Sequence, residues 1–135
     1  MELVGDFISE GRLVFHAKCF TQSYYEQQEE VKPNVAWFEA ERLPQFLDHL
    51  DSAAHFNNER HPGAGVLVGN SVTYVDLAAF HAASAAESQF PAGYALAIGK
   101  MPWLAAVRAK VAALPRIAAY MASSRRGLFE GNSMM

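Results

Sequence analysis

The sequence has little cysteine, little net charge and no long uninterrupted apolar run. Its single cysteine, Cys19, excludes a framework of internal disulfides and fits a reducing compartment. The net charge is only −3 and no basic face stands out, so we expect no nucleic-acid partner, because phosphate contacts need such a face. Charged residues and prolines interrupt the most apolar region, residues 77–107, whereas a membrane span needs about 20 clean apolar residues. We therefore expect no membrane span.

Further absences narrow the compartment and the chemistry. Glu2, Asp6 and Glu10 occupy the stretch where a secretory signal would be basic and then apolar, so we expect a cytoplasmic protein. The 5 histidines show neither i, i+4 pairing nor a His-Glu-x-x-His pattern, and the sequence contains no phosphate-binding loop or dinucleotide fingerprint. We expect no metal and no bound cofactor.

The sequence is rich in side chains for a core. Of the 135 residues, 51% are hydrophobic and 19% are charged, which excludes disorder, because a disordered chain combines low hydrophobicity with high net charge. The length suits one domain. We therefore predict a single domain over residues 1–135, with a polar and loose tail from about residue 125.

Apolar residues recur at steps of three and four along most of the chain, which predicts helices. Lys32-Pro33-Asn34 is expected to end the first helix, and Pro44 to start or kink the second. The predicted fold class is all-α, a bundle of about five or six helices. The expected helices cover residues 3–30, 35–56, 73–87, 102–113 and 115–124, with a loop at 57–65 and a mixed segment at 88–100.

The most specific local pattern lies around Thr73. Its hydroxyl can accept a hydrogen bond from the amide of Asp76, and the carboxylate of Asp76 can reach back to the amide of Thr73, which makes a capping box. Val72, before the cap, can pack on Leu77 as a hydrophobic staple. These residues predict a helix start, and we assign them no chemistry.

The same segment carries a family resemblance. Residues 68–76, V-G-N-S-V-T-Y-V-D, resemble the segment V-G-(D/N)-x-(L/I/V)-(S/T)-x-x-D that opens the sixth helix in the C-terminal domain of cytosolic glutathione transferases. Phe90-Pro91, followed by residues 101–104, resembles the F-P-x-L segment of that family. Residues 111–123 resemble its (V/L)-x-x-x-P-x-(I/L)-x-x-(F/Y)-x-x-S ending, and Ser9-Glu10-Gly11 falls where its first C-terminal helix often carries (D/E)-G.

The resemblance implies a fold and a role. In that family the helical domain binds the hydrophobic electrophile, while an N-terminal thioredoxin-like domain holds glutathione and activates its thiol. The sequence contains no match to that N-terminal domain, so we expect it to be absent and the chain to be inactive on its own. Whether the chain serves an enzyme therefore stays open. Glutathione is expected as a co-substrate only together with such a domain, in detoxification, and the family implies a homodimer or other self-association.

The resemblance also implies site residues. Counted from Glu10-Gly11, the positions that line the electrophile pocket are His16, Phe20 and Tyr24, spaced i, i+4, i+8 on one helix face. Glu10 itself matches an acidic residue near the subunit interface. The alternative for each is structural: an aromatic stripe on a helix is usually core, His16 fits a surface position, and Glu10 can simply be solvated. Where some classes place an aspartate that reaches glutathione across the dimer, this sequence has Val14.

Other functions and other residues remain as alternatives. Helical domains of this type also dock protein partners in translation factors and aminoacyl-tRNA synthetase complexes, so the chain can be a non-catalytic interaction module. A ligand that stabilises the chain favours the pocket, whereas tight self-association without a ligand favours the module. A generic helical bundle is the third possibility. Arg125 and Arg126 are interpreted as a charge pair at a helix end.

Overall fold

The computed structural model describes residues 2–129, and over that range it is all-helical, as predicted. A 3-10 turn, η1 (Tyr24–Glu26), precedes α2, and a π-helical segment, η2 (Phe38–Arg42), joins α2 to α3. The seven α-helices in this range are α1 (Glu2–Leu13), α2 (Gln28–Trp37), α3 (Leu43–Arg60), α4 (Tyr74–Gln89), α5 (Pro91–Ile98), α6 (Pro102–Ala112) and α7 (Pro115–Met121).

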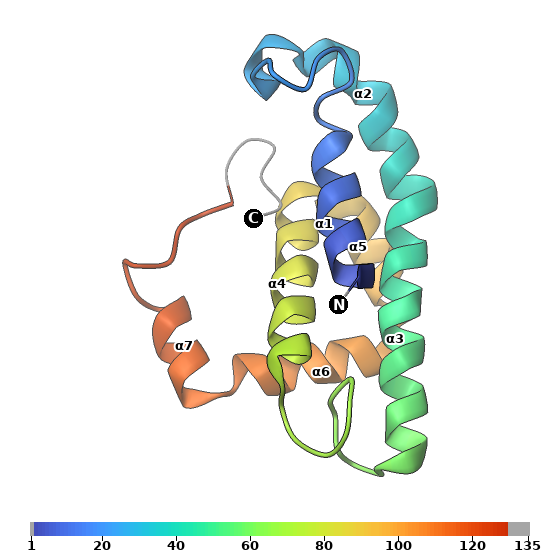
Figure 1. Cartoon of the computed structure of the whole chain (residues 1–135), viewed down its shortest axis with the longest axis vertical. Helices are drawn as coiled ribbons and strands as arrows, with labels where there is room; N and C mark the ends of the chain where they lie inside the picture. Colours follow the sequence, from blue (N-terminus) through green and yellow to red (C-terminus); the bar gives the residue numbers. More distant parts are fainter. Residues whose placement is uncertain (1, 130–135) are drawn as a thin grey trace.

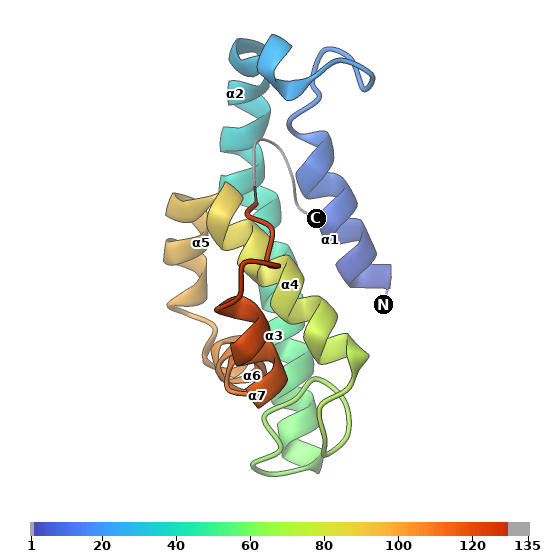
Figure 2. The ribbon, with the colours of Figure 1, turned by 90° about the vertical axis from the view of Figure 1, so that its left-hand side faces the viewer.

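The helices are arranged around one long rod and one central helix. Helices α2 and α3 run on through η2 as a single rod along the longest axis of the molecule (Figure 1). Helix α4 packs against α1, α5 and α6, and α6 crosses the lower half of the rod (Figure 1). Helix α7 packs on α6 and lies apart from the rod (Figures 1 and 2). Helix α4 therefore lies between the core on one side and α7 on the other.

The core is built on small side chains of α4. Ala79, Ala82, Ala83 and Ala86 recur at steps of three and four, and all are fully buried. Small residues let neighbouring helices approach closely, and the space is filled by larger residues from α1, η2, α3, α5 and α6. The fully buried large side chains include Phe7, Phe38, Phe90, Leu43, Leu47 and Leu104.

The first two predicted helices have the wrong boundaries. Helix α1 ends at Leu13, so the predicted helix over 3–30 is broken in its middle. Pro33 lies inside α2 instead of ending a helix. Pro44 lies in the first turn of α3, directly after the π-helical segment η2, and the rod continues through it. The helical stretch also runs beyond residue 56.

The capping box at Thr73 is confirmed. The side chain of Asp76 is fully buried, and its Oδ2 accepts hydrogen bonds from the Thr73 amide at 2.7 Å and the Thr73 hydroxyl at 3.0 Å. Its Oδ1 accepts a further bond from the Leu67 amide at 2.7 Å, which the sequence did not predict. Val72 and Leu77 line one surface cavity, but their packing as a staple stays a prediction.

A second buried side chain fixes the loop between α3 and α4. The amide of Asn57 donates to the carbonyls of Val66 (3.0 Å) and Gly69 (2.8 Å), and its oxygen accepts from the Gly69 amide at 2.8 Å. Gly69 has a φ of +70°, a conformation that a residue with a Cβ rarely adopts. Asn57 thus belongs to the last turns of α3, and the loop starts at residue 61 and not at 57.

Two helices receive their N-terminal caps from the rod. Helices α5 and α6 both begin with proline and have no cap side chain of their own. Glu39 of η2 accepts the amide of Gly93 at 3.1 Å, and Asp51 of α3 accepts the amide of Leu104 at 2.8 Å. A carboxylate in the first turn also stabilises the helix dipole. These contacts fix where α5 and α6 start relative to the rod.

We predict that Asp76→Asn lowers the free energy of unfolding by about 2–3 kcal/mol. The substitution replaces one accepting oxygen by an NH₂ group, which would then face the buried N–H of Leu67 or Thr73 without forming a hydrogen bond. Urea unfolding measures the change. Asp48→Asn is the matched control, since Asp48 is exposed on α3, and it should change stability by less than about 0.5 kcal/mol. Equal effects of the two substitutions would contradict the structural role of Asp76.

Candidate functional site

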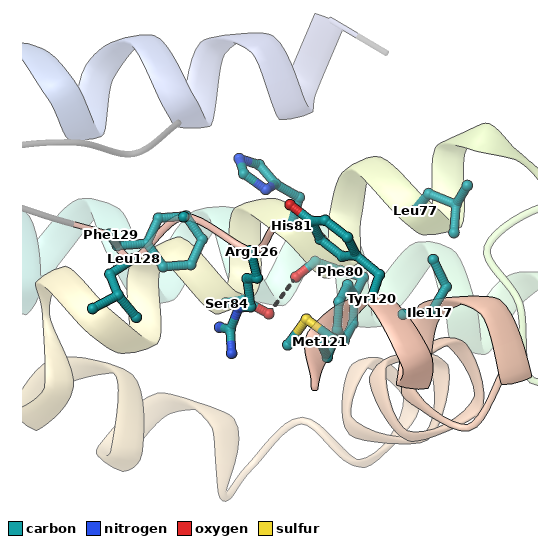
Figure 3. Close-up of a pocket in the computed structure, with 11 residues that line it drawn as sticks. Leu77, Phe80, His81, Ser84, Ile117, Tyr120, Met121, Arg126, Leu128 and Phe129 are labelled. Atoms are coloured by element: carbon teal, nitrogen blue, oxygen red, sulfur yellow. Dashed lines mark hydrogen bonds between the residues drawn. The ribbon is translucent and has the colours of Figure 1, made fainter. Parts of the chain in front are cut away.

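A largely apolar groove lies between α4, α7 and the segment that follows α7. It encloses a cavity of about 310 Å³ (Figure 3). We call this feature the α4–α7 groove. It is lined by Leu77, Phe80, His81, Ser84, Ile117, Tyr120, Met121, Arg126, Gly127, Leu128 and Phe129.

The helical period of α4 places its lining residues on one side of the groove. Leu77, Phe80, His81 and Ser84 follow the spacing i, i+3, i+4, i+7 and share one face of the helix. The alanines at 79, 82, 83 and 86 follow the same spacing on another face, which is buried in the core. One helix therefore supplies both a core face and a groove face. Figure 3 shows the α7 side chains opposite the groove face.

The segment after α7 closes the groove. Helix α7 ends at Met121, and residues 126–129 line the cavity from the side opposite α7. The ring of Phe129 lies 5.5 Å from the ring of His81. Residues 126–129 thus contribute to the groove, while the looseness of the tail from about residue 125 stays a prediction. Arg125 and Arg126 also lie beyond the helix end and do not cap it. The rest of the predicted tail, residues 130–135, lies outside the described residues.

The groove continues at both ends. A neighbouring cavity of about 490 Å³ shares Phe80, Ser84 and Arg126 with it and reaches Glu87 and Arg108. Another cavity, of about 610 Å³, shares Leu77 and Ile117 and reaches the N-terminal turn of α4. The walls at that second end are apolar side chains together with Thr73 and Arg116. An elongated apolar molecule can therefore extend along α4 in either direction.

Polar groups gather at the end near residue 87. Arg108 forms an ion pair with Glu87 at 2.6 Å and donates a hydrogen bond to the hydroxyl of Tyr94. Burial raises the pKa of Tyr94 to about 12, so at neutral pH the hydroxyl is protonated and accepts from Arg108. The hydroxyl of Ser84 donates to the Phe80 carbonyl of its own helix at 2.7 Å. These bonds are structural, and the groove suits binding better than bond-breaking.

Residues 2–129 lack two further features. None of the helices there is long and apolar enough to cross a bilayer. No three histidine, cysteine, aspartate or glutamate side chains gather in that range at a spacing that could hold a metal ion.

Comparison with known families identifies the domain. Residues 14–124 match the family model described as glutathione S-transferase, C-terminal domain. The chain belongs to this family. A comparison with curated proteins found no matching relative. The match begins just after α1 and ends before Arg126, so the segment that closes the groove lies outside the matched region.

This glutathione transferase C-terminal domain does not place His16, Phe20 and Tyr24 on one helix face, and that prediction was wrong. His16 lies in the turn after α1, Phe20 lies in the following loop with 74% of its surface exposed, and Tyr24 opens η1. Tyr24 packs edge-on against Phe15, with ring centroids 5.4 Å apart, so it contacts the core. The cavities described above are lined by other residues.

Gln27 is the physical reason for the break between α1 and α2. Its side chain is fully buried, and its oxygen accepts the amides of Lys18 (3.0 Å) and Cys19 (3.3 Å). Its NH₂ group donates to the carbonyls of Cys19, Gln22 and Ser23 at 3.0–3.4 Å. The backbone of this loop therefore bonds to one side chain in place of a helical ladder.

Glu10 has a partner within the chain. Its carboxylate binds Arg42 of η2 through two bonds, at 2.6 and 2.9 Å. The resemblance implied an arginine from another subunit, and Arg42 offers the same chemistry inside the domain. The interface role of Glu10 stays a prediction.

The sequence reading missed the residues of the groove for two reasons. The spacing of Leu77, Phe80, His81 and Ser84 was visible, but α4 has apolar residues on two faces, and only the fold shows which face is left for a ligand. The segment 126–129 has no periodic pattern. For the loop before α2 a signal existed: Ser23 and Glu26 have the spacing of a capping box, and the structure contains that box.

We predict that Gln27→Leu frees the amides of Lys18 and Cys19, so that their hydrogen exchange speeds up at least about tenfold. Heteronuclear NMR measures the exchange of each amide. Gln28→Leu is the control, since Gln28 is exposed at the start of α2 and should leave both rates unchanged. Unchanged exchange in Gln27→Leu would show that another contact holds this loop.

Proposed function

We propose that this domain binds an apolar small molecule in the α4–α7 groove. Joined to a thioredoxin-like domain, it would serve as the electrophile-binding half of a glutathione transferase. The observation that carries the proposal is the cavity between α4 and α7, where leucine, isoleucine, methionine and phenylalanine side chains face one another. The membership of the chain in the family of glutathione S-transferase C-terminal domains supports the same role.

The helical half of such an enzyme would desolvate the electrophile and orient it toward the glutathione thiolate. Apolar walls exclude water from an electrophile, and a fixed position beside a thiolate lowers the entropic cost of the encounter. The family places thiol activation in the thioredoxin-like domain, so the helical half supplies selectivity and not the nucleophile.

The affinity expected of the groove alone is modest. Burying about 200 Å² of apolar ligand surface contributes roughly 5 kcal/mol, which the loss of ligand freedom partly offsets. A dissociation constant of 1 mM corresponds to about 4 kcal/mol, so we expect binding on the order of 1 mM for a ligand the size of naphthalene. Such binding is measurable at millimolar ligand concentrations.

Protein docking is the second candidate function. Phe20 and Tyr25 are both exposed, on the segment between α1 and α2 that lies away from the groove. Exposed aromatic residues on one short segment favour a protein partner or a second copy of the chain. Sedimentation that shows tight self-association, together with an empty groove in the ligand test below, would favour docking over ligand binding.

We predict that the neutral ligand 2-acetonaphthone, at ten times its dissociation constant, stabilises the protein by about 1.4 kcal/mol, or roughly 5 °C in Tm. Ser84→Trp should abolish the shift, because an indole at this position fills the cavity. Ser52→Trp, on the exposed side of α3, is the control and should keep it. A shift that survives in Ser84→Trp would locate the ligand elsewhere.

We predict that the 135-residue chain conjugates glutathione to a model electrophile, 1-chloro-2,4-dinitrobenzene, only at the uncatalysed rate. Absorbance of the conjugate measures the rate, with buffer as the reference. A rate that rises in proportion to protein concentration would overturn this prediction and would require a thiol-activating group within these residues.

A further inference from the structure

Arg126 lies where the apolar cavity meets the polar end of the groove. It is half-buried, and it lines both the 310 Å³ cavity and the neighbouring 490 Å³ cavity. Figure 3 shows it extending from the C-terminal segment toward the part of α4 that carries Ser84. A ligand in either cavity therefore lies next to a guanidinium.

The other charged side chains that line these two cavities are already engaged. Among the described residues that line these two cavities, one carries a carboxylate, Glu87. It forms an ion pair with Arg108 at 2.6 Å. Arg108 is also held by the hydroxyl of Tyr94 and lies over that ring, 5.2 Å from its centroid. Within residues 2–129 no carboxylate lies within ion-pairing distance of Arg126. The 310 Å³ and 490 Å³ cavities thus share one positive charge that their described lining residues do not neutralise.

We propose that the ligand of the α4–α7 groove is an apolar carboxylic acid, with its hydrocarbon part between α4 and α7 and its carboxylate on Arg126. The inference rests on the proposed function and adds the ligand class. A guanidinium binds a carboxylate through two parallel N–H···O bonds, and the apolar walls strengthen that attraction by excluding water. A phosphate dianion needs more donors than this one side chain supplies, so a carboxylate is the better match.

The test compares the affinities of two ligands that have nearly the same shape but differ in charge. The probes are 2-naphthoate and 2-acetonaphthone, which differ in a carboxylate oxygen against a methyl group. For the unaltered protein we expect 2-naphthoate to bind at least about tenfold more tightly than 2-acetonaphthone, as measured by isothermal titration calorimetry. This comparison needs no variant and so does not depend on how a substitution folds.

The variants assign the preference to one side chain. Arg126→Gln should bring the two affinities within about twofold of each other, because it removes the charge that only 2-naphthoate pairs with. Arg126→Lys keeps the charge and should keep part of the preference. Arg125→Gln is the matched control: Arg125 is the neighbouring arginine, it is exposed, and it lines neither cavity, so the preference should be intact.

The outcomes separate this inference from the proposed function. Equal affinity of the unaltered protein for both probes would overturn the carboxylate class and leave apolar binding standing. A preference that persists in Arg126→Gln would overturn the assignment to Arg126. Binding of neither probe would overturn the proposed function and, with it, the inference.

Discussion

The hydrogen bonds of the buried Asp76 carboxylate are the interactions on which the rest of the structure depends. The carboxylate accepts bonds from Thr73, at the start of α4, and from Leu67, in the loop that comes from α3, so it joins the loop to the helix. Helix α4 starts there and presents its alanine face to the core. The groove face, at Leu77, Phe80, His81 and Ser84, is then fixed on another side by the helical period. The direction in which the groove opens therefore follows from where α4 begins.

The opposite wall of the groove depends on contacts made at a distance. Asp51 of the rod accepts the amide of Leu104, which sets the start of α6, and α6 leads directly to α7. Glu39 does the same for α5 through Gly93, where an added Cβ would meet the side chain of Glu39 at 3.0 Å. Carboxylates at three helix N-termini thus position the elements around α4.

The sequence predicts what is encoded locally. The all-α class follows from periodicity, and the start of α4 follows from Thr73 and Asp76, because cap and partner lie within one turn. The break between α1 and α2 had one local signal, the spacing of Ser23 and Glu26. The bonds of Gln27 to Lys18 and Cys19 had none, since they form only when the loop folds around that side chain. The caps from Asp51 and Glu39 join residues more than fifty positions away and have no local pattern. The predicted shared face of His16, Phe20 and Tyr24 was wrong for the same reason, because it needs an unbroken helix, and their role in a pocket stays a prediction.

In the proposed function, the ligand lies between α4 and α7 and not on the loop after α1. Hydrogen–deuterium exchange by mass spectrometry, with and without saturating 2-acetonaphthone, tests this most directly, because the two regions give separate peptides. We expect slower exchange in peptides that cover residues 115–121 and 122–129, which both contribute lining residues to the groove, and no change over residues 14–27. Protection confined to residues 14–27 would contradict it and would return the site to His16, Phe20 and Tyr24.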